Sequence, residues 1–172
     1  MISGVDPAER SVRGALAHVS SRYEIVECNP ALADTAAFCA AYGYEPDDSA
    51  NTILVVGRSD PARYAACVVL ATTRLDVNRM VRTRLGVRKA SFADADRTRT
   101  VTGMDIGGVT ALGLPPDLPL WIDAGVMERD RIVLGGGSRS IKIIGPPALL
   151  TEMPGAEIVE RLALPISPSA DA

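Results

Sequence analysis

The sequence predicts a single α+β domain in which helices flank one mixed, partly barrel-like β-sheet. The chain has 172 residues, a length that suits one domain. Its local patterns run helix, strand, helix, and then mostly strands with helices inserted, an order typical of mixed folds. No internal repeat or linker divides the chain. We therefore place the domain over residues 1–164 and expect residues 165–172 (PISPSADA) to form a disordered tail.

Each element follows from its own local signal. Asp6 can cap a first helix and Pro7 suits its first turn, while Gly43 and Gly86 mark helix ends. The apolar runs 51–57 and 64–71 predict a β-hairpin. The expected helices cover residues 6–19, 33–42, 76–85, a segment capped by Asp94, and 148–152. The expected strands cover residues 23–28, 51–57, 64–71, 89–92, 120–124, 131–134 and 141–144.

Two glycine-rich segments fit neither a helix nor a strand. The segment 102–119 (TGMDIGGVTALGLPPDLP) combines four glycines with three prolines, and a GGGS run follows at 135–138. Neither has the spacing of a P-loop or of a dinucleotide-binding fingerprint. Each segment could simply be a tight turn. Alternatively, the glycines let the backbone approach a ligand, so that N–H groups bind a carbonyl or a developing oxyanion.

The sequence offers little for side-chain catalysis. Its single histidine, His18, falls on the predicted first helix, where a structural or surface role is expected, so a Ser-His-Asp or Cys-His arrangement is not predicted. Cys28, Cys39 and Cys67 form no CxxC pair, and we expect buried free thiols rather than disulfides or a metal site.

Charge and hydropathy limit the kinds of partner that the protein is expected to bind. The net charge of −3 argues against broad binding to a phosphate backbone. It is compatible with binding of only the end of an RNA. Residues 74–99 carry a local excess of cations, which is either a solvated helix face or an RNA-facing patch. No apolar run is long enough to span a bilayer and the start of the chain has no signal core, so we expect a soluble cytoplasmic protein without membrane contact.

Several segments together resemble the YbaK/EbsC family, which includes the bacterial prolyl-tRNA-editing domain and free-standing aminoacyl-tRNA deacylases. They are YEIVECNPALADTAAFCAAYG, NTILVV, RLDVNRMVRTRLGVRKASFAD, VTGMDIGGVTALGLPPDLPLWIDA and LGGGSRSIKI. The resemblance covers roughly residues 10–160. It implies a YbaK-like fold with a pocket at one end of the sheet, and hydrolysis of the ester between a wrong amino acid and tRNA without a metal or organic cofactor.

The resemblance also implies site residues. Gly107, Gly108, Val109 and Thr110 match the loop whose backbone N–H groups contact the substrate carbonyl in the family. Substrate-binding positions are implied at Asn51, Thr102, Gly103, Ala111, Asp123, Gly136, Ser138 and Lys142. The implied partner is the aminoacyl-tRNA acceptor end; an aminoacyl-tRNA synthetase and a weak homodimer are left open.

Two positions depart from the family pattern. Asn51 stands where a strand-opening lysine is usual, and Ala111 replaces the proline that closes the glycine loop. Asparagine cannot pair with a phosphate as lysine does, and alanine leaves the loop less rigid. Lys142, Arg139 and Lys89 are candidate substitutes for the missing cation. We therefore keep three hypotheses: a trans-acting deacylase, a non-hydrolytic module that binds tRNA ends or nucleotides, and a purely structural or partner-binding domain.

Overall fold

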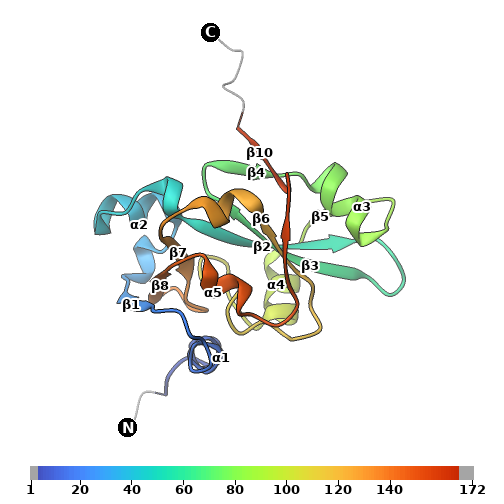
Figure 1. The fold of residues 1–172 in the computed structure, drawn as a ribbon. Helices are drawn as coiled ribbons and strands as arrows, with labels where there is room; N and C mark the ends of the chain where they lie inside the picture. The colour runs from blue at the N-terminus through green and yellow to red at the C-terminus, as the bar shows by residue number, and fades with distance from the viewer. Residues whose placement is uncertain (1–3, 167–172) are drawn as a thin grey trace.

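A computed structural model describes residues 4–166 of the chain as an α+β fold with mixed sheets (Figure 1). The α-helices are α1 (Pro7–Leu16), α2 (Thr35–Tyr42), α3 (Arg82–Leu85), α4 (Ala95–Thr102) and α5 (Ala148–Thr151). The strands are β1 (Glu24–Glu27), β2 (Ala50–Gly57), β3 (Arg63–Leu70), β4 (Thr73–Leu75), β5 (Ala90–Phe92), β6 (Leu120–Asp123), β7 (Ile132–Gly135), β8 (Ile141–Gly145), β9 (Ala156–Val159) and β10 (Ala163–Pro165).

The central element is a five-stranded sheet in the order β5-β2-β3-β6-β9. The predicted hairpin forms its middle, with β2 antiparallel to β3 along eight residue pairs. β6 then joins β3 in parallel and β9 joins β6 in parallel, which makes the sheet mixed. Successive side chains on a strand point to opposite faces, so Leu54 enters one core and Val55 enters another.

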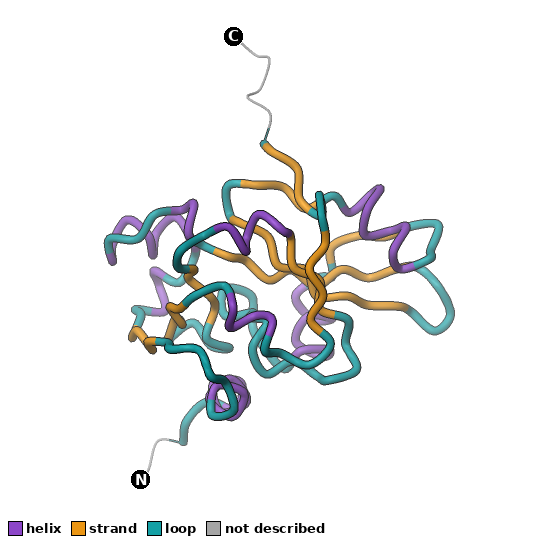
Figure 2. Tube along the Cα trace, viewed as in Figure 1, coloured by secondary structure: helices purple, strands orange, loops and turns teal. Residues whose placement is uncertain are grey.

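The main core lies between this sheet and a three-stranded sheet of order β1-β8-β7 (Figure 2). The two sheets meet where Ser49, just before β2, bridges Val133 of β7, and this joins them in a partly barrel-like arrangement. Helix α1 contributes Val12 and Leu16 to this core, and α5 contributes Leu149 and Leu150, all of them buried.

A second apolar layer covers the other face of the five-stranded sheet. A π-helical turn at Val77–Val81 leads directly into α3, and together they form the helical segment predicted over 76–85. Buried residues of this segment pack with Trp121 and Leu162. β4 and β10 form a two-stranded sheet beside this layer.

The elements differ from the sequence predictions mainly at short edges. Helix α1 ends at Leu16, three residues before the expected end at Val19. Strands β4, β9 and β10 were not predicted. β4 and β10 pair with each other and β9 pairs with β6, and local sequence patterns carry no information about such long-range pairing. Strand β10 includes Pro165, the first residue of the expected tail, and residues 167–172 of that tail lie outside the described residues. Between residues 4 and 166, no helix is both long and apolar enough to cross a membrane.

Candidate functional site

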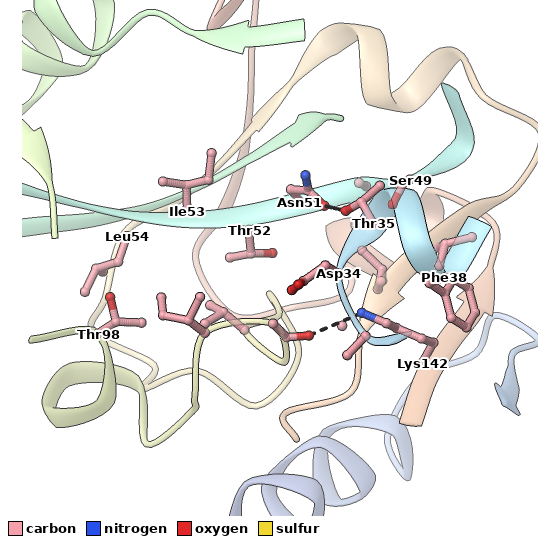
Figure 3. Close-up of a pocket in the computed structure, with 18 of the residues that line it drawn as sticks. Asp34, Thr35, Phe38, Ser49, Asn51, Thr52, Ile53, Leu54, Thr98 and Lys142 are labelled. Atoms are coloured by element: carbon pink, nitrogen blue, oxygen red, sulfur yellow. Dashed lines mark hydrogen bonds between the residues drawn. The ribbon is translucent and has the colours of Figure 1, made fainter. Parts of the chain in front are cut away.

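A cavity of about 380 Å³ opens between α2, the first half of β2, the glycine loop 106–109 and the hairpin formed by β7 and β8 (Figure 3). Its volume lies toward the lower end of sites that hold small molecules, about 300–1,000 Å³. Apolar side chains make up much of the wall, including Phe38, Ile53, Leu54 and Val109. Among them stand a few polar groups: Asp34, Thr35, Ser49, Asn51, Thr52, Thr98 and Lys142.

Among residues 4–166, Lys142 is the only lysine or arginine that lines this cavity. It lies on β8 between Ile141 and Ile143, whose side chains enter the main core, so strand alternation directs Lys142 to the opposite face. Only 8% of the residue is exposed, and its Nζ lies 5.6 Å from the centre of the Phe38 ring. Burial lowers the pKa of Lys142 from its ordinary value, because it disfavours the charged form.

Asn51 lies on the same cavity as Lys142, although 91 positions separate them in the chain (142 − 51). It is the second residue of β2, and its Oδ1 accepts a hydrogen bond of 3.2 Å from the Thr35 hydroxyl at the start of α2. Figure 3 shows both side chains on the wall formed by β2 and α2. A cation therefore does reach this cavity, but it comes from β8 rather than from the strand-opening position.

The glycine loop is anchored by carbonyl contacts to the β7–β8 hairpin. Arg139 Nη1 donates to the Ile106 carbonyl at 3.2 Å, Lys142 Nζ donates to the Gly107 carbonyl at 3.2 Å, and the Gly137 N–H donates to the Gly108 carbonyl at 2.7 Å. These three bonds hold the loop without the proline that is usual in the family at the position of Ala111.

The backbone donors of the loop are not equivalent. Gly107 and Val109 line the cavity, and their N–H groups make no hydrogen bond to any residue between 4 and 166. Gly108 is outside the lining, and its N–H donates to the Asp105 carbonyl at 2.9 Å. Thr110 is also outside the lining and is fully buried.

The remaining predicted binding residues have contacts away from the cavity. Thr102 ends α4, with its hydroxyl donating to the Thr98 carbonyl, and Gly103 caps that helix in a left-handed conformation. Ala111 is buried in the main core. Ser138 donates to Glu9 of α1. Gly136 is buried, and a side chain at this position would collide with Ile141.

Asp123 also lies outside the cavity lining. Its Oδ2 accepts a hydrogen bond of 3.0 Å from the Gly125 N–H, and its Oδ1 accepts one of 2.9 Å from the Ala163 N–H. The carboxylate therefore connects the end of β6 to the start of β10. Its structural contacts account for a buried acidic residue at this position.

The cavity contains residues that sequence reasoning did not select. Thr52 is the most informative of them, because its hydroxyl is buried without a hydrogen-bond partner among the described residues. Thr35, Phe38 and Thr98 also line the wall. The alternating pattern of β2 places Thr52 and Leu54 on one face, but the sequence does not show that this face borders a cavity.

The three cysteines and the histidine do not line the main cavity. All three cysteines are free and buried, as predicted, and burial raises the pKa of the Cys67 thiol to about 12. His18 is exposed beyond the end of α1 and lines a separate apolar cavity. The described residues accordingly place no nucleophile–histidine pair in the lining of the main cavity.

The sequence model of the aminoacyl-tRNA editing domain matches residues 29–152. This match spans well over half of the chain and includes α2, β2, the glycine loop and Lys142. The chain belongs to the aminoacyl-tRNA editing domain family. The resemblance seen in the sequence is thereby confirmed.

Solved structures share the fold of this editing domain. A protein proposed as a trans-editing enzyme for prolyl tRNA synthetase is 23% identical, with a TM-score of 0.76, and the match covers 91% of this chain and 98% of the other. The hypothetical protein APE2540 is 22% identical, with a TM-score of 0.78 and coverage of 90% and 99%. At 22–23% identity, this likeness establishes the α+β fold of the editing domain and does not extend to its chemistry.

Proposed function

We propose that this protein is a trans-acting aminoacyl-tRNA deacylase, which hydrolyses the ester of a mischarged tRNA. Membership of the editing-domain family supports an aminoacyl-tRNA substrate. The 380 Å³ cavity would take the amino acid and the terminal adenosine. In the reaction, water adds to the ester carbonyl carbon and the bond from that carbon to the ribose oxygen breaks. The products are the free amino acid and a tRNA with a restored hydroxyl.

The observation that carries this proposal is the position of Lys142 against the glycine loop. Its ammonium would lie beside the bound ester and supply the positive charge that Asn51 cannot supply. The N–H groups of Gly107 and Val109 would bind the carbonyl oxygen as negative charge develops on it, because they have no other described partner. Since the cavity lining lacks histidine, proton transfer falls to water or to a substrate hydroxyl.

The wall of the cavity supports a preference for small amino acids. Phe38, Ile53 and Leu54 offer apolar contact, whereas the limited volume would exclude large side chains. The structural neighbour proposed to act for prolyl tRNA synthetase makes alanyl-tRNA(Pro) and cysteinyl-tRNA(Pro) the first substrates to try. A synthetase partner and a weak homodimer stay predictions.

The decisive experiment compares wild-type protein with Lys142→Met on this panel. We expect kcat/KM for deacylation to fall by about 10²–10³, the usual cost of removing one preorganised stabilising group. Arg22→Met is the matched control, because it removes an exposed cation that does not line the cavity and should change kcat/KM less than about twofold. Thermal unfolding of both variants would show that each remains folded.

Two results would change the assignment. If Lys142→Met hydrolyses as fast as wild type, the lysine only supports the loop and the catalytic proposal fails. If wild-type protein binds tRNA but releases no amino acid from any substrate, the second candidate holds: a non-hydrolytic module for tRNA ends or nucleotides. The departure at Asn51 favours that candidate, and Asn51→Lys would then test whether a strand-opening lysine restores turnover.

A further inference from the structure

A second cavity lies at the far end of β2, around the turn of the β2–β3 hairpin. Its volume is about 610 Å³, larger than that of the first cavity. Four segments meet there: the hairpin itself, the helical segment 77–85, the residues leading into β5, and the start of α4. Figure 1 shows β5 and α3 beside the β2–β3 hairpin.

Cationic side chains dominate the wall of this cavity. Within the described part of the chain, its lining contains no Asp, Glu or aromatic residue, and Asn78, Ser59 and Ser91 add neutral hydrogen-bonding groups. Five cations converge on it from different segments: Arg58, Arg82, Arg88, Lys89 and Arg97.

These five cations are also free of carboxylate partners. None of them forms a salt bridge within residues 4–166. Other arginines of the basic stretch are paired: Arg84 contacts Glu157 and Arg99 contacts Asp105. The fold thus gathers Arg58 and four cations of residues 74–99 into a concave group of positive charge without salt-bridge partners among the described residues. Such a group attracts anions and focuses their local concentration.

The two cavities are adjacent along the same elements. β2 lines the first cavity with residues 50–54 and the second with Val56 and Gly57. On α4, Thr98 lines the first cavity and Arg97 lines the second. From Thr52 to Gly57 the strand extends about 17 Å at about 3.3 Å per residue. At about 3.4 Å per stacked nucleotide, this distance corresponds to about five nucleotides.

We propose that the second cavity binds backbone phosphates of the tRNA acceptor stem while the aminoacyl end occupies the first. This inference rests on the proposed aminoacyl-tRNA substrate and extends it to a second contact. The absence of aromatic residues from the lining favours phosphates over stacked bases, because base stacking on a protein uses aromatic side chains. The site would secure the register of the RNA without reading its sequence.

The test measures binding of an uncharged acceptor-stem minihelix by fluorescence anisotropy over a range of KCl concentrations. The variant Arg58→Gln/Arg88→Gln/Arg97→Gln should weaken binding about tenfold or more at low salt and reduce the slope of log K against log salt by about 3. The control Arg10→Gln/Arg22→Gln/Arg74→Gln removes the same charge from exposed residues outside both cavities and should change the slope by less than about 1.

A second probe, the trinucleotide CCA, distinguishes binding at the first cavity from binding at the second. Because it is too short to reach the second cavity, its affinity should be equal for wild type and the first variant. The inference is overturned if both triple variants weaken minihelix binding equally, if neither does, or if the first variant weakens CCA binding as strongly as minihelix binding. These assays measure binding and do not depend on hydrolysis. If wild-type protein shows no deacylation but its minihelix binding keeps the predicted salt dependence, the deacylase proposal fails and the proposed phosphate site still stands.

Discussion

At the scale of single residues, burial determines what the cavity's polar groups can do. Lys142 is held in a partly apolar wall, where its charge meets less competition from water than on the surface. Its hydrogen bond to the Gly107 carbonyl fixes the ammonium next to the loop. Asn51 contributes an amide that is engaged by Thr35. Lys142 therefore brings an ammonium group to the cavity and Asn51 brings an amide.

Thr52 allows a test of whether the cavity is built for a ligand. Its buried hydroxyl has no described partner, and an unsatisfied buried polar group costs about 1–3 kcal/mol. Thr52→Val should therefore raise the free energy of unfolding by about 1 kcal/mol in urea denaturation while weakening substrate binding. A loss of stability of 1 kcal/mol or more would show instead that the hydroxyl is already paired in the free protein.

Thr102→Val is the matched control for this measurement. The Thr102 hydroxyl is equally buried, but it donates to the Thr98 carbonyl and accepts from the Met104 N–H. The same substitution should therefore lower the free energy of unfolding by about 1–3 kcal/mol.

At the scale of elements, the contact between the glycine loop and the β7–β8 hairpin shapes the site. Gly108 is needed for this contact because of space rather than backbone conformation. A Cβ at this position would lie 2.5 Å from the Ser138 carbonyl oxygen. The close approach allows the Gly137 N–H to reach the Gly108 carbonyl. A substitution at Gly108 therefore changes the shape of the cavity even though the residue does not line it.

We expect Gly108→Ala to separate the loop from the hairpin. Amide hydrogen exchange should show a large loss of protection at the Gly137 N–H, because its acceptor moves away. In Gly103→Ala, the new methyl group faces open space and the residue keeps a left-handed conformation, at a cost of about 1–2 kcal/mol. That control should leave Gly137 protected. Equal protection in both variants would contradict the steric role of Gly108.

At the scale of the whole molecule, Asp123 connects the central sheet to the C-terminal strand. Asp123→Ala would leave the Ala163 and Gly125 N–H groups without their acceptor, and the free energy of unfolding should fall by about 1–3 kcal/mol in urea. Deacylation assayed well below the melting temperature should stay within about threefold of wild type. A loss of tenfold or more in folded protein would assign Asp123 to the site, as the family resemblance implies.

Local sequence patterns determined most of the architecture. Apolar periodicity located the β2–β3 hairpin, the helical segment 76–85 and the core strands, because side-chain period depends only on neighbouring residues. Caps and glycines marked several helix ends. The motifs of the glycine loop and of the hairpin before Lys142 were specific enough to identify the editing-domain family.

Tertiary structure alone decided how these parts combine. Pairing of distant strands and packing of loops brought Lys142 to the cavity that holds Asn51, and it placed Gly107 but not Gly108 on the cavity wall. The same long-range packing places five cations around the second cavity and pairs Arg84 and Arg99 with carboxylates. Periodicity carries no information about contacts between segments far apart in the chain. The family resemblance implied a pocket, but the residues that line it and the existence of the second cavity could not be read from the sequence.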